Sequence, residues 1–445
     1  MLNIFFFFYE IFWRLLIPVL WLLSETTVPK WKEGFKQRMG IGLDNLPATP
    51  IWFHAVSVGE LNAMVPILKH FSEFNIVVST TTASSQALAK KKLAAELMDG
   101  RMELIYMPYD TPSIIKKTFG KIQPKALIIM ETEIWPSLIN EAYIREIPSA
   151  IINARLADKS FKQYKNFHFF FSWIFNQISL VLAQSADDSR KFLSLGVSSE
   201  KLFMTGNMKF AIIPEMKKDE SYDLKRSLGF KKDHVLLTAA STHPGEEAAL
   251  ISMYQELRLK HKNLRLAIAP RHPERFSVVE DIILSAAKLE VNRYSKSNFK
   301  ETGADNDLVR SEDVLLIDTI GDLMKFFAIS DIAFVGGTLV DKIGGHNVLE
   351  PAAYALPVVV GPFYFKNIDV VELLEKAGAL EVLESNLDLK DFIDTLVSDK
   401  ERRIIMGAQA HKIVSQNREV LKVVTSKLKD LLNTSIINEM KKADV

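Results

Sequence analysis

DIAFVGGTLVDKIGGHNVLEPAAYALPVVVGP, residues 331–362, predicts a strand, a glycine loop, a short helix and a second strand. The apolar run 332–335 ends at one glycine pair, and a second pair precedes a helix predicted to begin at His346-Asn347. Residues 358–360 form the next apolar run. In open α/β sheets, loops at the carboxyl ends of strands hold ligands, and glycines allow a ligand to approach the backbone. The stretch therefore predicts one ligand-binding edge of a parallel sheet.

Two interpretations of Glu350 are open from this stretch. Asn347-Val348-Leu349-Glu350 fits a capping box, in which Glu350 only closes the start of a helix. Alternatively, Glu350 accepts hydrogen bonds from a ribose diol while the amides behind Gly345 face a phosphate. Capping boxes are common, so the spacing alone does not separate the two.

Length and composition narrow the class of protein. The 445 residues provide for two or three domains with their own cores. The net charge is +1 with 24% charged residues, so no overall electrostatic field points to nucleic acid. The chain has no cysteine, which excludes disulfides, zinc–cysteine sites and cysteine nucleophiles and fits a cytoplasmic location.

The amino-terminal segment predicts a membrane anchor. Residues 2–23 are apolar apart from Asn3, Glu10 and Arg14, and their number is about what a membrane-spanning helix needs. Glu10 and Arg14 are four residues apart and can pair on one helix face, and Pro18 predicts a kink or an end. The segment either crosses the membrane or lies in its surface, with a core helix as the alternative. A basic and aromatic flank at residues 30–32 fits the anionic cytoplasmic leaflet.

The rest of the chain alternates strand and helix patterns, which predicts parallel, doubly wound sheets. The charged stretch 214–223 interrupts the pattern and is the expected linker. We therefore expect an anchor at residues 1–28, a first Rossmann-like domain at 29–212 and a second at 213–445. If the two domains bind the two substrates of a transfer reaction, the acceptor is expected in the first domain and the donor in the second. The expected strands cover residues 51–57, 76–79, 103–107, 126–130, 150–153, 180–183, 235–240, 264–269, 314–317, 332–335 and 358–360.

Acidic residues follow two strands of the first domain. Glu60 and Glu131 each come shortly after an apolar run, at the sheet edge where active sites form. A carboxylate there can serve as a general base for a substrate hydroxyl. The alternatives are a capping box from Ser57 to Glu60, and a polar strand end in water for Glu131 and Glu133.

Residues 155–175 place basic residues before a run of aromatic residues. This order fits an anionic, lipid-like partner or a second membrane contact. A solvated helix face joined to an apolar core helix explains it equally well.

The loops of the second domain bring Ser241, Arg271, Gly321 and Glu350 to one sheet edge. An arginine at such a position suits a phosphate, although an ion pair with Glu274 is the simpler interpretation. His243 and His272 are interpreted as structural, because lone histidines usually are and no histidine pair has metal-ligand spacing.

Taken together, six motifs resemble the 3-deoxy-D-manno-oct-2-ulosonic acid (Kdo) transferases of lipopolysaccharide synthesis. They occur in the family's order and span nearly the whole chain. The motifs are HAVSVGE at 54–60, METEIWP at 130–136, NAR at 153–155, GNMKF at 206–210, PRHPER at 270–275 and GGHNVLEP at 344–351.

The resemblance implies an α/β protein of the GT-B glycosyltransferase fold, with two Rossmann-like doubly wound domains and an amino-terminal membrane-anchoring helix. It implies transfer of Kdo from CMP-Kdo to the lipid A precursor lipid IVA, with inversion and with neither a metal nor another cofactor, at the cytoplasmic face of the inner membrane. Another GT-B sugar-nucleotide enzyme, such as a UDP-sugar epimerase or a lipid-linked glycosyltransferase, is the alternative enzyme. A membrane-bound nucleotide sensor without turnover is the alternative of another class.

The resemblance also implies roles for individual residues. Glu60 is the expected general base, and Glu131 and Lys209 are expected to stabilise the transition state. The residues expected to border CMP are Pro270, Arg271, Ile320, Gly321, Asp322, Asn347, Val348, Leu349 and Glu350. No DxD-type acidic pair accompanies the donor loops, which is consistent with metal independence.

Overall fold

A computed structural model describes residues 2–26, 33–212, 224–226, 228–286, 289–296, 314–385 and 387–443. They form two compact units, Met1–Ile212 with Asn417–Val445 (unit 1) and Ile213–Gln416 (unit 2). Residues 417–445 thus group with unit 1, whereas the sequence analysis assigned them to the second domain. The basic flank at 30–32 and the linker at 214–223 lie outside the described residues.

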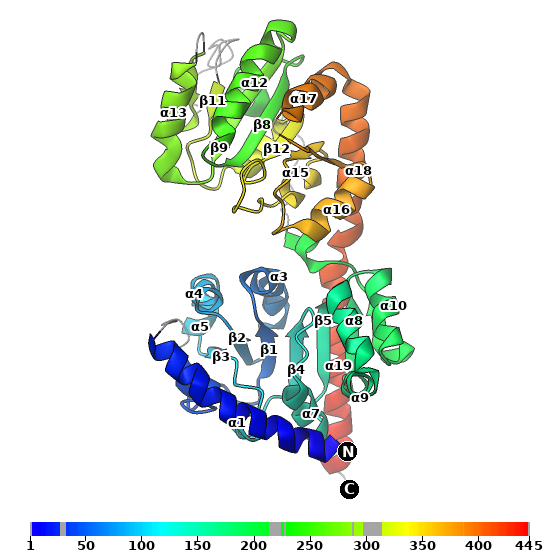
Figure 1. Cartoon of the computed structure of the whole chain (residues 1–445). Helices are drawn as coiled ribbons and strands as arrows, with labels where there is room; N and C mark the ends of the chain where they lie inside the picture. The colour runs from blue at the N-terminus through cyan, green and yellow to red at the C-terminus, as the bar shows by residue number, and fades with distance from the viewer. Residues whose placement is uncertain are drawn as a thin grey trace. The chain divides into compact units, whose positions relative to one another are not determined.

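Unit 1 contains a parallel seven-stranded sheet in the order β3-β2-β1-β4-β5-β6-β7 (Figure 1). Its strands are β1 Ile51–Ala55, β2 Ile76–Thr80, β3 Met102–Tyr106, β4 Ala126–Met130, β5 Ser149–Ala154, β6 Leu180–Ala183 and β7 Leu202–Met204. Its helices are α1 Leu2–Thr26, α2 Phe35–Arg38, α3 Val58–Leu68, α4 Ala83–Lys92, α5 Ala94–Met98, α6 Pro112–Ile122, α7 Pro136–Ile144, α8 Asp158–Asn166, α9 His168–Asn176, α10 Ala186–Ser194 and α19 Val420–Ala443, with 3-10 turns η2 Lys69–Phe71, η3 Ser199–Lys201 and η4 Met208–Ile212.

The sheet of unit 1 is buried on both faces, because side chains alternate along each strand. Phe53 packs into one core layer, and Trp52 packs into the layer on the other face. The α19 residues Val420, Val424 and Leu428, four apart, form an apolar stripe that belongs to the same layer as Phe53. This stripe is the physical reason that the carboxy-terminal helix joins unit 1.

Unit 2 repeats the architecture with a parallel sheet in the order β10-β11-β9-β8-β12-β13-β14. Its strands are β8 Val235–Thr242, β9 Leu264–Pro270, β10 Val291–Arg293, β11 Val314–Leu316, β12 Ile332–Val335, β13 Val358–Val360 and β14 Leu380–Val382. Its helices are α12 Glu246–Lys260, α13 Phe276–Ser285, α14 Leu323–Ile329, α15 Leu349–Ala353, α16 Ile368–Lys376, α17 Asp388–Ser398 and α18 Lys400–Arg418, with 3-10 turns η5 Pro273–Arg275 and η6 Tyr294–Lys296. The prediction of two doubly wound parallel sheets is confirmed.

Helix α1 lies along the surface of unit 1 and is not a core helix. The predicted Glu10–Arg14 pair forms at 2.9 Å, and the helix continues through Pro18 to Thr26. The Tyr9 hydroxyl donates to the buried Asp110 carboxylate at 3.0 Å, which fixes one face of α1 to unit 1.

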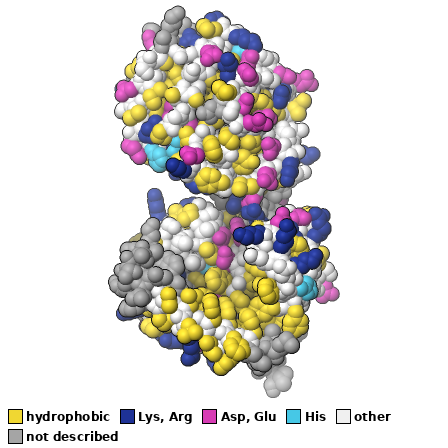
Figure 2. Space-filling view, in the orientation of Figure 1, with side chains coloured by type: hydrophobic (Ala, Val, Ile, Leu, Met, Phe, Trp, Pro, Cys, Tyr) yellow, Lys and Arg dark blue, Asp and Glu magenta, His cyan; other side chains and the backbone are white. Residues whose placement is uncertain are grey.

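The opposite face of α1 is apolar and exposed, with Phe7, Phe8, Phe12, Leu15 and Val19 all more than half exposed. Figure 2 shows hydrophobic side chains gathered over the part of unit 1 where this helix runs. Within the described residues, no helix combines the length and the hydropathy needed to cross a membrane.

Candidate active site

The predicted catalytic acids of unit 1 lie at the point where the strand order reverses. Strands β1 and β4 are neighbours although β2 and β3 come between them in the chain. Glu60 lies in the first turn of α3, just after β1, and Glu131 directly follows β4. Because both strands are parallel and paired, their carboxyl ends bring the two acids to the same place, the usual ligand position of such sheets.

Glu60 takes part in the predicted capping arrangement. The Ser57 Oγ accepts a hydrogen bond from the Glu60 backbone N–H at 3.2 Å, and the Glu60 Oε2 accepts one from the Val56 N–H at 2.9 Å. Only 6% of Glu60 is exposed. The contact holds the carboxylate at the sheet edge, so the capping role and a role in catalysis are compatible.

A third carboxylate, Glu133, belongs to the same group. Burial, together with the negative charges of Glu60 and Glu131, raises the pKa of Glu133 to about 7. Glu131 and Glu133 line a cavity of about 280 Å³ together with Arg155 and Tyr164. Glu131 and Glu133 are thus half-buried at a cavity and not simply polar strand ends in water.

Lys209 lies on a turn that packs against the helix of Glu60. The turn η4 contacts α3, and its Met208 N–H donates to the Asn153 Oδ1 at 2.9 Å. Asn153 is fully buried with a φ of 53°, so two of the predicted motifs meet here. The Lys209 side chain is half-buried and, in the described part of the chain, forms no ion pair with the three acids.

In unit 2 the strand order reverses between β8 and β12, and a buried glutamate holds the loops there. The Glu246 carboxylate accepts the backbone N–H groups of His243, Gly337, Thr338 and Leu339 at 2.8–3.0 Å. Burial raises the pKa of Glu246 more than these hydrogen bonds lower it. Sequence analysis missed this residue, which lies in the first turn of α12 and shows no pattern beyond an acidic helix start.

Arg271 faces a group of side chains from several loops. Its charge lowers the pKa values of His243, His346 and Glu350, although burial is the largest influence on each and raises the pKa of Glu350 overall. The expected ion pair with Glu274 is not observed among the described residues; the Glu274 carboxylate lies 3.8 Å from the Nδ1 atom of His272. The structure thus brings Arg271 and Glu350 together, as the sequence analysis expected.

His243 and His346, from loops after β8 and β12, form a direct pair. Their Nε2 atoms are 2.8 Å apart and their ring planes are within 5° of each other. One nitrogen must donate and the other accept, so the contact requires at least one neutral ring. Burial, followed by the charge of His243, lowers the pKa of His346 to about 4. His243 is therefore not the isolated histidine that the sequence analysis expected.

The loop around Glu350 differs in detail from the predicted capping box. Helix α15 begins at Leu349, later than predicted, and has five residues. Asn347 Oδ1 accepts the Leu349 N–H and its Nδ2 donates to Glu350 Oε1, both at 3.1 Å. Val348 and Leu349 bury their side chains, so any contact they make with a ligand falls to their backbone.

The remaining expected CMP contacts lie at the same sheet edge. Pro270 ends β9, and residues 320–322 follow β11, which pairs with β9. Ile320 is 83% exposed and Gly321 has a φ of 96°. Asp322 pairs with Lys325 at 2.7 Å, and in the described structure this turn forms no hydrogen bond with Arg271 or Glu350.

Comparison with known proteins places this architecture in a family. The profile of the 3-deoxy-D-manno-octulosonic-acid transferases (kdotransferases) matches residues 33–212. A 3-deoxy-D-manno-octulosonic acid transferase of Haemophilus influenzae is 33% identical over 95% of this chain and 96% of its own length. One from Rickettsia bellii is 31% identical over 92% of this chain and 95% of its own.

A solved glycosyltransferase from Rickettsia africae matches in fold alone. Its TM-score is 0.50 at 12% identity, over 88% of this chain and 99% of the other. The fold is therefore the GT-B glycosyltransferase architecture. From the sequence similarity over nearly its full length, this chain belongs to the 3-deoxy-D-manno-octulosonic acid transferase family and is a glycosyltransferase that transfers Kdo in lipopolysaccharide synthesis.

Proposed function

We propose that this chain transfers Kdo from CMP-Kdo to lipid IVA, with inversion at the anomeric carbon, without a metal, and with Glu60 as the general base. The observation that supports it best is the grouping of Glu60, Glu131 and Glu133 at the β1–β4 edge. Such a group can take the proton of a sugar hydroxyl, which is the chemistry that a Kdo transferase requires.

In the proposed reaction, the acceptor hydroxyl gives its proton to the Glu60 carboxylate. Its oxygen forms a bond to the anomeric carbon of Kdo while the bond from that carbon to the phosphate oxygen breaks. CMP leaves with the electron pair, and a single displacement inverts the centre. The transition state is oxocarbenium-like, so the negative charge of Glu131 stabilises it. Lys209 is the second residue that we propose to stabilise the transition state.

Unit 2 supplies the groups for CMP. Arg271 provides a fixed, forked cation for the phosphate, and Glu350 accepts hydrogen bonds from the ribose hydroxyls. Pro270, the turn at 320–322 and the backbone of Asn347, Val348 and Leu349 border the nucleotide. Arg275 and Lys366 contribute to the same positive potential, since both lower the pKa of His243. These cations offset the phosphate charge, which is why the proposal includes no metal.

The membrane part of the proposal places the chain on the cytoplasmic face of the inner membrane. The exposed apolar face of α1 suits a helix that lies in the membrane surface. Flotation with vesicles tests this part, with Phe8→Ser/Leu15→Ser as the variant that loses binding.

The test of the reaction uses the purified full chain with CMP-Kdo and a tetraacylated lipid A precursor. Mass spectrometry of the product shows whether Kdo is added and how many residues each acceptor receives. Turnover that persists with a strong chelator supports the proposal. No Kdo adduct, or activity only with an added divalent cation, contradicts it.

A further inference from the structure

Outside the acidic edge, unit 1 has a second cavity, of about 590 Å³, between helices α8 and α10. Its charged lining consists of Lys162, Lys165, Arg190 and Lys191 with the carboxylates of Asp158 and Asp187. Four cations against two carboxylates leave an excess of two positive charges. The aromatic ring of Phe161 completes one wall.

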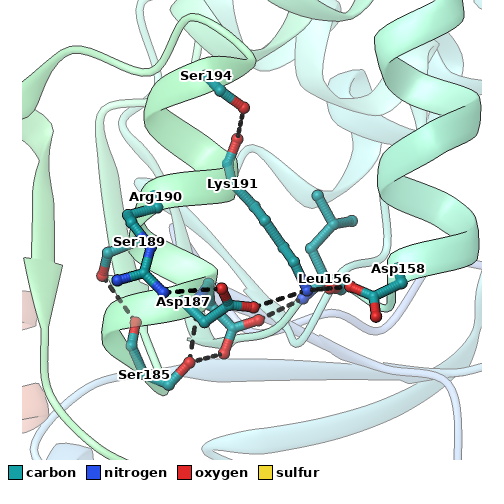
Figure 3. A network of polar contacts seen from close by, with 9 residues as sticks. Leu156, Asp158, Ser185, Asp187, Ser189, Arg190, Lys191 and Ser194 are labelled. Carbon is teal, nitrogen blue, oxygen red and sulfur yellow. Dashed lines mark hydrogen bonds and ion pairs between the residues drawn. The ribbon is translucent and has the colours of Figure 1, made fainter.

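Two of the four cations, Lys191 and Arg190, belong to a network of ion pairs that holds the two helices together. Lys191 extends from α10 and donates to the Leu156 carbonyl at 3.0 Å, while it pairs with Asp158 and Asp187 at 2.6 and 2.9 Å (Figure 3). Burial lowers the pKa of Lys191, but these two carboxylates outweigh it and raise the pKa. Arg190 pairs with Asp187 at 3.0 Å on the exposed side. This network joins the start of α8 to α10 and fixes the shape of the cavity.

The other two lysines are not used by that network. Lys162 and Lys165 lie one turn apart on α8, both exposed, and within the described residues neither side chain has a hydrogen-bond or ion-pair partner. Like charges one helical turn apart repel each other, and an anion bound by both relieves that repulsion. A phosphate monoester carries about −1.5 to −2 charges at neutral pH, which matches the excess charge of the cavity.

The surroundings indicate the kind of molecule that carries the phosphate. Directly after α8, Phe167 and Phe169 are 68% and 69% exposed, as expected beside a lipid. Arg155, Leu156 and Ala157, which lead into α8, line the cavity of Glu131 and Glu133. Ser160 and Tyr164 of α8 line that cavity, whereas Phe161, Lys162 and Lys165 line the cationic one, so the two cavities lie on different faces of the same helix. A helix is about 10–12 Å across with its side chains, a distance that one glycolipid headgroup can span.

We propose that the α8–α10 cavity binds a phosphate group of the glycolipid acceptor, with Lys162 and Lys165 as its main contacts. The site holds the acceptor headgroup so that its reacting hydroxyl lies at the acidic edge of the same unit. This inference rests on the proposed function for the identity of the acceptor. On this proposal basic residues of 155–175 contact an anionic, lipid-like partner, whereas part of the aromatic run packs internally, with Ile174 and Phe175 buried in the core.

The test compares Lys162→Gln/Lys165→Gln with Lys159→Gln, a lysine exposed on the same helix but outside the cavity lining. Each is assayed with the phosphorylated tetraacylated lipid A precursor and with the same lipid after phosphatase treatment. We expect the double variant to raise KM for the phosphorylated acceptor about tenfold, with kcat and KM for CMP-Kdo unchanged. With the dephosphorylated acceptor, wild type and double variant should be equal, and Lys159→Gln should behave as wild type throughout.

Three results overturn the inference: an unchanged KM in the double variant, an equal loss with the dephosphorylated acceptor, or an equal effect of Lys159→Gln. The phosphate could also belong to a lipid headgroup of the membrane. Binding to vesicles with and without phosphatidylglycerol distinguishes that source from the acceptor. If the double variant loses binding to anionic vesicles while its acceptor KM is unchanged, the lysines serve the membrane surface and not the acceptor.

Failure of the proposed function has a different signature. In that case wild type turns over neither lipid, and direct binding of the phosphorylated precursor by calorimetry still tests the cavity. Binding that is weaker in the double variant than in Lys159→Gln then supports the phosphate site, and equal binding rejects it.

Discussion

The carboxyl edges of the two sheets are built alike and charged oppositely. Each has its ligand position where the strand order reverses, between β1 and β4 in unit 1 and between β8 and β12 in unit 2. Unit 1 places Glu60, Glu131 and Glu133 there, whereas unit 2 places Arg271 beside a histidine pair. The same architecture therefore provides one edge suited to accepting a proton and another suited to holding an anion.

The buried acids of the two edges also do different work. In unit 2, the Glu246 carboxylate accepts hydrogen bonds from four backbone N–H groups and so holds the loops in place. In unit 1, Glu60 accepts a single backbone hydrogen bond from Val56 in the described structure. A carboxylate with spare accepting capacity is the better base, so this difference favours the proposal that Glu60, and not Glu246, acts in catalysis.

Removing the base should have the largest effect. We expect Glu60→Gln to lower kcat by roughly 10²–10⁴-fold, since that is the usual contribution of a general base. The amide oxygen can still accept the Val56 N–H, so the thermal midpoint and KM for CMP-Kdo should change little. Steady-state kinetics with a melting curve measure both, and Glu200→Gln, an exposed acid of the same unit, is the control. Full activity in Glu60→Gln would show that the acid edge has another purpose.

The second-largest expected effect concerns Arg271, at the carboxyl edge of the sheet in unit 2. Arg271→Ala should weaken CMP binding by about 10- to 100-fold, the value of one charge-assisted hydrogen bond. Arg271 is exposed and forms no ion pair within the described residues, so unit 2 should keep its stability. Calorimetric titration with CMP measures the change, against Lys376→Ala as the control on the exposed end of α16. Equal affinities in the two variants would remove Arg271 from the nucleotide site.

The positions of Glu60 and Arg271 at the carboxyl edges were predictable from the apolar strands that precede them, whereas the roles expected of them came from the resemblance to the family. The doubly wound sheets were predictable for the same reason, since buried runs such as 126–130 and 332–335 are unambiguous. The edge strands β10 and β14 were not predicted, because Asn292, Arg293 and Glu381 interrupt the apolar run that marks the equally short β13. The stripe on α19 predicts a helix but does not tell which sheet it covers.

What the sequence could not reveal depends on contacts between distant residues. His243 and His346 are 103 positions apart, and their pairing follows only from the adjacency of β8 and β12. Glu246 is likewise defined by backbone groups about ninety residues away. The raised pKa of Glu133 needs its burial and two neighbouring charges, neither of which a spacing rule contains.

The titration of Glu133 gives the third test. Its pKa is about 7 in the folded protein against an ordinary value of 4.5, so the folded state binds this proton more tightly than the unfolded chain. The resulting stability is complete below pH 4.5 and is lost as pH rises through about 7. Glu133→Gln has no such proton, so its melting temperature should fall less than that of wild type from about pH 5 to about pH 8.

At the higher pH, the free energy of unfolding of Glu133→Gln should rise by about 2 kcal/mol relative to that of wild type. This is less than the whole pKa shift implies, because solvent screens the charge of a half-buried group. Asp110, whose pKa burial also raises to about 7, is present in both proteins and cancels in the comparison. Parallel melting curves for wild type and variant would mean that Glu133 is ionised like an ordinary surface acid.

The smallest expected effect concerns His346 in unit 2, whose pKa is lowered where that of Glu133 is raised. The pKa of His346 is lowered from 6.5 to about 4, so the unfolded chain binds its proton more tightly, and unit 2 loses stability as pH falls from 6.5 toward 4. His346→Gln keeps a hydrogen-bond partner for His243 but does not titrate, so it should lose about 1 kcal/mol less than wild type between about pH 7 and about pH 5. His411→Gln, on an exposed histidine of α18, is the control.

Melting curves at the two pH values decide the point, and the result bears on how the cationic edge holds its ligand. If the difference is seen, the histidine pair is neutral at physiological pH, and Arg271 with Arg275 and Lys366 supplies the permanent charge for a phosphate. If wild type and His346→Gln respond equally to acid, the pKa of His346 does not differ between the folded and unfolded states. The histidine pair would then gain a proton in the ordinary range of a histidine, and the positive charge of this edge would increase with mild acid.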